Sequence, residues 1–227
     1  MAPSAPSIGR LGDYFAFLGV PRKLNLDTAD LEQKFRTLSR QYHPDYFYNA
    51  APAERRASLE RSSYLNDAYR ALKQPTTRIG YLLELEGFVP AGGDPSRASK
   101  EVPPALLEEV FALNEELDEA RELRAGGAPP DEWGARLQRA RQPIENKRVE
   151  HEEQLRVLSA KWDALVDAPS AESERRAVLT ALRERMLERN YISNLLATIE
   201  REAADVGRQA PGSGPGVPEA RSPKPES

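Results

Sequence analysis

The residues with the clearest potential for chemistry are His43, Pro44 and Asp45, which place one of only two histidines in the 227-residue chain two positions from a carboxylate. Such a pair could act in acid–base catalysis, provided that neighbouring groups orient it within a pocket. The sequence offers no Ser/His/Asp arrangement and no carboxylate cluster to do so, and it lacks the Gly-x-x-x-x-Gly-Lys-Ser/Thr loop that binds nucleotide phosphates. We therefore predict that the chain has no catalytic residues and is not an enzyme.

A metal or cofactor site is not expected either. The chain has no cysteine, so it has neither disulfides nor thiolate ligands. The second histidine, His151, falls on the apolar row of a long predicted helix, where a hydrogen-bonded structural role is expected. Two separated histidines without cysteine do not make a metal site, and we expect no cofactor.

The element that leads into His43 is a predicted helix. Its apolar residues Leu31, Phe35, Leu38 and Tyr42 recur at steps of four, three and four, which is typical of one buried helical face. The proline that follows His43 lacks an N–H and disfavours helical geometry before it, so the helix should end here. The His-Pro-Asp segment is then expected on an exposed turn, where polar side chains often serve recognition. A helix stop with a capping aspartate is the simpler alternative.

Two arginines extend the candidate site along this helix. Arg36 and Arg40 project opposite the apolar stripe, since successive helical residues are turned by about 100°. On most helices such a face is only solvated. Because both arginines lie near the His-Pro-Asp turn, we predict that they contact a partner.

The surrounding N-terminal elements resemble a J domain, the module that activates DnaK-type chaperones. A short aromatic helix is predicted over 14–20, a long helix begins near Pro52 and stops at Pro75, and a last short helix covers 77–86. The segments that carry a closer resemblance, to the HscB family of iron–sulfur cluster assembly, are Asp13-Tyr14-Phe15, Arg40-Gln41-Tyr42-His43-Pro44-Asp45-Tyr46-Phe47 and Tyr81-Leu82-Leu83-Glu84-Leu85-Glu86-Gly87. One departure is Tyr46, where many J domains carry lysine.

The rest of the chain predicts a bundle of three helices. Leu106, Val110, Leu113, Leu117 and Ala120 alternate steps of four and three, as in the seam of an antiparallel bundle. The predicted fold is all-α, a J domain with a helical hairpin and short flanking helices, followed by an antiparallel three-helix bundle. We place a mobile leader at residues 1–11, the J domain at 12–89, a linker at 90–102, the bundle at 103–205 and a disordered tail at 206–227. Pro143 should kink or split the second bundle helix.

The resemblance to the HscB family implies two partners. His43, Pro44 and Asp45 would stimulate ATP hydrolysis by a DnaK-type chaperone, HscA in the bacterial system. The bundle would bind an IscU-like iron–sulfur scaffold protein through its first and last helices. The matching positions are Leu107, Phe111, Glu115, Glu119 and Tyr191.

Composition limits the other possibilities. The net charge is +2 over residues 1–89 and −6 over residues 90–227, which disfavours nucleic acid as a partner because phosphate binding needs a concentrated basic surface. No apolar run approaches the ~20 residues of a membrane span, and residues 1–10 lack a signal-like core, so we expect a cytoplasmic protein. The alternative function is an all-α adaptor, or a J protein that serves a different client without a role in iron–sulfur assembly.

Overall fold

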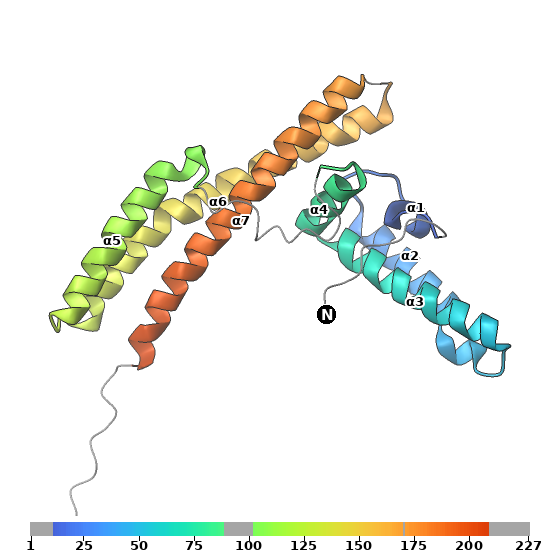
Figure 1. The fold of residues 1–227 in the computed structure, drawn as a ribbon, viewed down its shortest axis with the longest axis horizontal. Coiled ribbons are helices and arrows are strands. Elements are labelled where there is room, and N and C mark those ends of the chain that lie inside the picture. Colours follow the sequence, from blue (N-terminus) through green and yellow to red (C-terminus); the bar gives the residue numbers. More distant parts are fainter. Residues whose placement is uncertain (1–10, 89–101, 170, 209–227) are drawn as a thin grey trace, which may run out of the picture. The chain divides into compact units, whose positions relative to one another are not determined.

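The regular structure is entirely helical throughout residues 11–88, 102–169 and 171–208, which are the residues that the computed structural model describes (Figure 1). The predicted all-α class is confirmed. Most of the predicted leader and linker, and residues 209–227 of the predicted tail, lie outside the described residues. In chain order the elements are α1 (Tyr14–Leu18), α2 (Thr28–Gln41), η1 (Pro44–Phe47), α3 (Pro52–Lys73), α4 (Pro75–Leu85), η3 (Pro104–Leu106), α5 (Leu107–Ala125), α6 (Pro130–Asp167) and α7 (Glu172–Arg208).

The first two helices start where their capping residues predict. The Asp13 carboxylate accepts a hydrogen bond from the Ala16 N–H at 2.9 Å, and Gly19 ends α1 in the left-handed conformation, with φ of 65°. The Asp27 carboxylate caps α2 by accepting from the Ala29 N–H at 2.8 Å. These caps fix the start of the helix that leads into the His-Pro-Asp turn.

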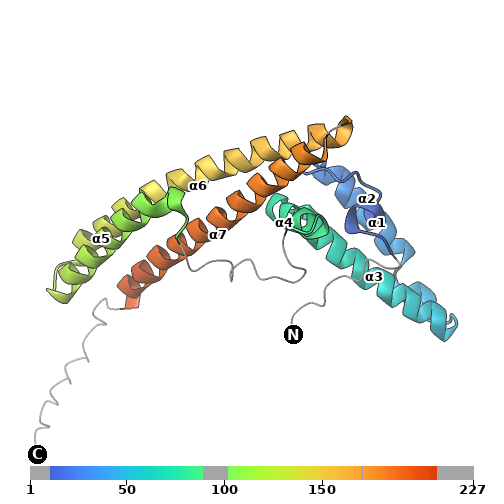
Figure 2. The ribbon, with the colours of Figure 1, turned by 45° about the horizontal axis from the view of Figure 1, so that its top comes forward.

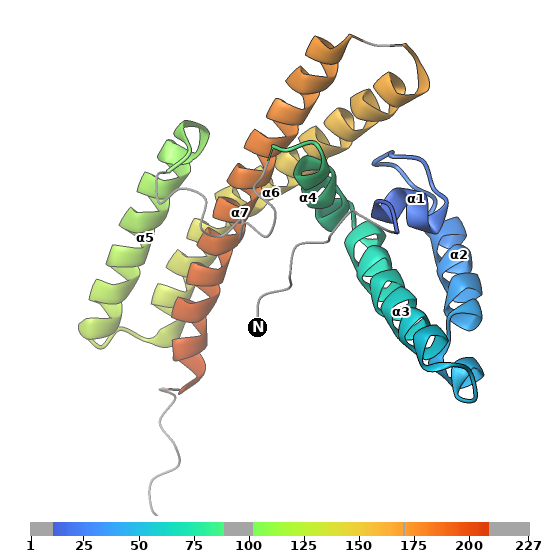
Figure 3. The same cartoon turned by 45° about the vertical axis from the view of Figure 1, so that its right-hand side comes forward.

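An apolar core joins α1, α2 and α3. Figure 3 shows α2 and α3 lying side by side as an antiparallel pair that residues 42–51 connect at one end. The Tyr14 and Tyr81 rings stack at 4.3 Å, and the Tyr81 hydroxyl accepts a hydrogen bond from the Tyr14 N–H, which attaches α4 to α1. The most deeply buried members of this core include Phe15, Leu18, Leu31, Leu65 and Leu72.

Two prolines act differently from the sequence prediction. The helix expected from residue 77 begins at Pro75, because a proline fits the first turn of a helix, where its missing N–H costs nothing. Of the two effects predicted for Pro143, a split is wrong, because α6 runs unbroken from Pro130 to Asp167 (Figure 2), whereas a kink stays a prediction. Ala140 and Ile144 on either side of Pro143 are buried, so their packing compensates for the backbone hydrogen bond that Pro143 cannot donate.

Contacts divide the chain into two units, which share α6 and α7 between them. The first unit comprises Met1–Leu106 and Asn146–Ile192, and the second comprises Leu107–Glu145 and Ser193–Ser227. The domain limits expected from the sequence stay a prediction.

Within the first unit, residues of α6 and α7 cover one side of α4. Polar contacts secure this packing: the Asp163 carboxylate accepts from the Leu24 and Asn25 N–H groups at 2.6 and 2.9 Å, and the Trp162 indole donates to the Arg22 carbonyl at 2.8 Å. The apolar cluster at this contact consists of Leu24, Ile79, Leu82, Leu83, Leu155, Trp162, Leu179 and Leu182.

A buried arginine completes the same region. The side chain of Arg78 donates to the carbonyls of Leu72 and Lys73, at the end of α3, and to the carbonyl of Leu24. Burial lowers the pKa of Arg78, but three carbonyl acceptors satisfy its guanidinium. Arg78 thus joins α3, α4 and the segment before α2.

In the second unit, ion pairs join α5 to the first part of α6 and to the last part of α7. Arg121 of α5 contacts Glu202 of α7 at 2.5 Å, and Arg136 of α6 contacts Glu116 of α5 at 3.3 Å. The predicted seam of α5 is buried at most of its positions and partly buried at Val110. The buried residues are Leu113, Leu117 and Ala120 of α5, and Leu106 of η3, which belongs to the first unit.

Candidate partner-binding sites

The His-Pro-Asp turn follows directly from the end of α2. His43 is the first residue of the turn, and its Nδ1 accepts a hydrogen bond from the Asp45 N–H at 3.3 Å. Since a neutral imidazole carries its proton on the nitrogen that is not an acceptor, this bond leaves Nε2–H as a donor for a partner. The side chains of His43 and Asp45 are 49% and 84% exposed. The turn therefore displays a donor and a carboxylate to the surroundings.

The base of the turn is tied to α3. Ser58 is 2% exposed, and its hydroxyl donates to the Tyr42 carbonyl at 2.8 Å. The Arg61 guanidinium lies over the Tyr42 ring, 5.6 Å from its centroid. The sequence analysis did not single out Ser58. The available signal was spacing, since Ser58 lies seven and ten residues before Leu65 and Ala68, on the same helical face.

This geometry does not form a catalytic site. His43 Nδ1 lies 3.5 Å from Asp45 Oδ2, but both side chains are open to solvent. A catalytic pair needs a third group that orients it and a cavity that excludes water, and the turn provides neither. Exposure and fixed orientation suit contact with another protein.

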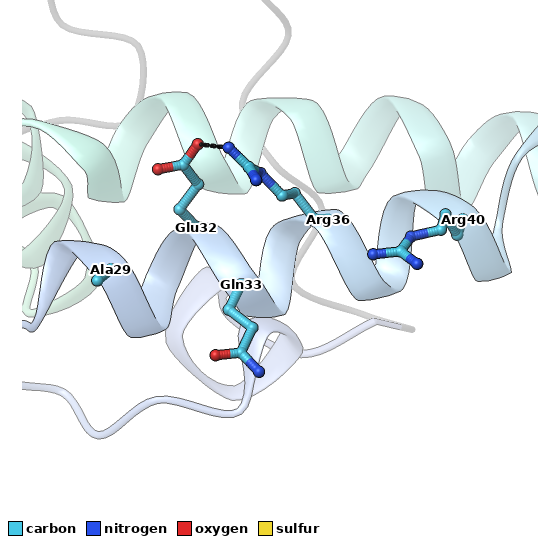
Figure 4. A pocket seen from close by; sticks show the side chains of 5 residues that line it. All are labelled: Ala29, Glu32, Gln33, Arg36 and Arg40. Atoms are coloured by element: carbon cyan, nitrogen blue, oxygen red, sulfur yellow. Dashed lines mark hydrogen bonds and ion pairs between the residues drawn. The ribbon is translucent and has the colours of Figure 1, made fainter.

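The two predicted arginines lie on one face of α2 (Figure 4). They line a shallow hollow of about 350 Å³ together with Ala29, Glu32 and Gln33. Arg36 is held by Glu32, one helical turn earlier, at 2.6 Å. Arg40 is exposed, and no acidic partner for it occurs among the described residues. The guanidinium of Arg36 is thus engaged within α2, whereas that of Arg40 is not, and contact of either arginine with a partner stays a prediction.

Three of the four predicted scaffold-binding residues of α5 are also exposed. Leu107 and Phe111 are 42% and 71% exposed, and Glu115, one turn further along the same helix, is exposed as well. Glu119 is engaged differently, because its carboxylate pairs with Arg136 of α6. Of the two acids, Glu115 is the one left open to a partner.

Tyr191, the remaining predicted scaffold-binding residue, lies on α7 in the first unit and is half buried. The α5 residues belong to the second unit. The structure therefore brings Leu107, Phe111 and Glu115 together on one helix, while a shared patch with Tyr191 stays a prediction.

The second histidine is structural, as expected from the sequence. His151 is 2% exposed, and its Nε2 lies 2.6 Å from a Glu188 carboxylate oxygen that also contacts Arg185 at 2.7 Å. Burial lowers the pKa of His151; Glu188 opposes this shift, but Arg185 and the nearby Lys147 reinforce it. No group of three or more His, Cys, Asp or Glu side chains among the described residues is arranged to hold a metal ion.

Comparisons with known proteins agree with this arrangement. The DnaJ domain family model matches residues 13–81, which contain the complete His-Pro-Asp turn and its supporting helices. Among solved structures, human co-chaperone protein HscB is 26% identical, with a TM-score of 0.58 over 88% of this chain and 85% of its own. Chaperone HscB from Vibrio cholerae shares the fold at 23% identity, with a TM-score of 0.53 over 86% of this chain and 99% of its own.

Fold and turn together define a J-domain protein, and a J domain implies a chaperone of the DnaK type as its partner. Because the likeness to HscB structures extends beyond the J domain over most of the chain, the protein is a J-domain co-chaperone of the HscB type. The family resemblance expected from the sequence is confirmed. Co-chaperones of this type are adaptors rather than enzymes. None of the helices in the described segments has the length and apolar character to cross a membrane.

Proposed function

We propose that this co-chaperone stimulates ATP hydrolysis by an HscA-like chaperone of the DnaK type and delivers an IscU-like iron–sulfur scaffold protein to it. The observation that carries the chaperone half is the exposed His43 and Asp45 pair, held on a hydrogen-bonded turn within the J domain. Catalysis by the co-chaperone itself is not needed, because its part is to bind the chaperone and bias its ATPase.

The scaffold half is supported by the exposed apolar side chains of α5. Leu107 and Phe111 lie one helical turn apart, so they are neighbours on the helix surface. Glu115 adds an exposed carboxylate on the next turn, which suits a client surface that combines apolar and basic groups. Tyr191 is included in the proposed scaffold-binding set on the family resemblance. A cytoplasmic location stays a prediction.

The deciding experiment measures ATP hydrolysis by a purified HscA-like chaperone alone, with this protein, and with both this protein and an IscU-like scaffold. We expect stimulation by the co-chaperone and further stimulation when the scaffold is added. His43→Gln should abolish both, while its melting temperature stays close to that of the wild type, since exposed substitutions usually change stability by less than ~0.5 kcal/mol. A large loss of stability would show that His43 serves only the fold.

The same experiment separates the alternatives. A protein that stimulates the chaperone but gains nothing from the scaffold would be a J protein with a different client. A protein that leaves the ATPase rate unchanged would be an all-α adaptor, contrary to the proposal.

A further inference from the structure

The three residues after Asp45 are all aromatic, yet the structure treats them differently. Phe47 is half buried, whereas Tyr46 and Tyr48 on either side are 74% and 77% exposed. In the described part of the chain, these two are the most exposed of the large apolar and aromatic side chains. Exposed apolar groups are common one at a time, so the feature to explain is the pair beside the His-Pro-Asp turn.

The backbone beneath these two rings is fixed by hydrogen bonds. The Tyr46 N–H donates to the His43 carbonyl at 3.1 Å, and the Tyr48 N–H donates to the Asp45 carbonyl at 3.4 Å. The Tyr48 carbonyl in turn accepts from Arg55 of α3 at 3.5 Å. The rings therefore project from an ordered turn, and less conformational entropy is lost when a partner covers them.

Tyr46 also shares a surface with the imidazole of His43. The two rings meet edge to face, with centroids 6.0 Å apart and planes inclined by 68°. A partner that reaches His43 is thus within reach of the Tyr46 ring. Tyrosine is among the side chains that most often dominate binding energy, because it buries a large rigid ring and keeps a hydroxyl for a polar contact.

We propose that Tyr46 and Tyr48 form an aromatic rim that binds an apolar surface of the DnaK-type chaperone, next to the site that receives His43 and Asp45. This inference rests on the chaperone half of the proposed function. The occupant follows from continuity, since Tyr46 directly follows Asp45 and contacts His43. The rim complements Arg36 and Arg40 of α2: the arginines supply an attraction that salt screens, and the rim supplies one that salt does not weaken.

The test uses the full chain and a purified HscA-like chaperone with ATP. The variants are Tyr46→Ala and Tyr48→Ala, with Tyr46→Phe and Tyr48→Phe as matched variants that keep the ring. Val149→Ala, which truncates an exposed valine of α6, controls for the loss of apolar surface elsewhere. The readout is the co-chaperone concentration that gives half-maximal stimulation, measured at low and high salt, together with the melting temperature of each variant.

We expect each alanine variant to raise the half-maximal concentration by about tenfold, the effect of a modest interface anchor. The increase should be the same at low and high salt, and the phenylalanine variants and Val149→Ala should behave like the wild type. Melting temperatures should not change, because neither tyrosine belongs to the core.

Unchanged half-maximal concentrations for both alanine variants, with a wild type that stimulates normally, would overturn the aromatic rim alone. A wild type without any stimulation would overturn the proposed function and the rim with it. Sedimentation analysis adds one more outcome: a self-associated wild type that both alanine substitutions turn into a monomer would assign the rim to a second copy of this chain and overturn its assignment to the chaperone.

Discussion

Removal of the exposed apolar pair of α5 should weaken scaffold binding without unfolding the protein. The change is the double substitution Leu107→Ala and Phe111→Ala. Phenylalanine offers about 200 Å² of surface, and with 71% of Phe111 exposed, about 140 Å² stays open for a partner to cover. At about 25 cal/mol per Å², full coverage is worth about 3.5 kcal/mol and half coverage about 1.7 kcal/mol.

Half coverage of Phe111 alone already corresponds to about a twentyfold change in affinity. We therefore expect the double variant to bind a purified IscU-like scaffold at least about tenfold more weakly, even if Leu107 contributes nothing. Calorimetric titration of wild type and variant measures the difference. In the ATPase assay, stimulation by the variant alone should persist, whereas the additional stimulation from the scaffold should disappear.

Two controls make this prediction strict. Leu113 lies on the same helix but is buried, so Leu113→Ala should lower stability by about 2–5 kcal/mol. The double variant should instead melt cooperatively, close to the wild-type temperature. Equal scaffold affinities for wild type and double variant would refute the reasoning, and a collapsed melting transition would show that these side chains support the fold.

The remaining predictions concern charge. Arg40→Ala should weaken stimulation of the chaperone more than Arg36→Ala, most clearly at low salt. Glu32→Gln should strengthen the stimulation, because it frees Arg36 from its ion pair. Equal effects of the two arginine substitutions at every salt concentration would contradict the assignment of Arg40 as the more available cation. Burial holds the pKa of His151 below its usual value near 6.5, so between the lowered pKa and about pH 6.5 the unfolded chain binds more protons than the folded chain. The free energy of unfolding should therefore decrease as the pH falls through this range. Urea melts of wild type and His151→Gln from about pH 7.5 to about pH 5 measure this, and the slope of stability against pH should be smaller in the variant. Identical slopes would show that folding does not shift the pKa of His151, and a larger slope in the variant would show that Glu188 raises that pKa.

The local features of the site were largely predictable from the sequence. The Asp27 cap, the apolar stripe from Leu31 to Tyr42 and the proline after His43 determine where α2 begins and ends, and each acts within a few residues. The exposure of Leu107 and Phe111 could likewise be predicted, because both fall outside the regular seam of α5.

The long-range polar contacts could not be predicted in this way. Asp163 accepts hydrogen bonds from residues about 140 positions earlier, and nothing near it in the sequence distinguishes it from any exposed acid on a helix. Arg78 was equally hidden, since a buried arginine is identified only by the carbonyls that surround it. Periodicity has a similar limit: the apolar rows of α6 and α7 continue along both helices, and they do not reveal which part belongs to which unit.

Because α6 and α7 pack over α4, this J domain is poorly suited to transfer into another protein by itself. Ile79, Leu82 and Leu83 look like the core of a self-contained module, but Trp162 and Leu182 from the far end of the chain complete their burial. A fragment that ends at residue 88 would keep its His-Pro-Asp turn but would expose this apolar surface of α4 to water, which promotes aggregation. Chimeras that borrow the J domain should therefore also carry residues 146–192, or replace the uncovered leucines with polar side chains.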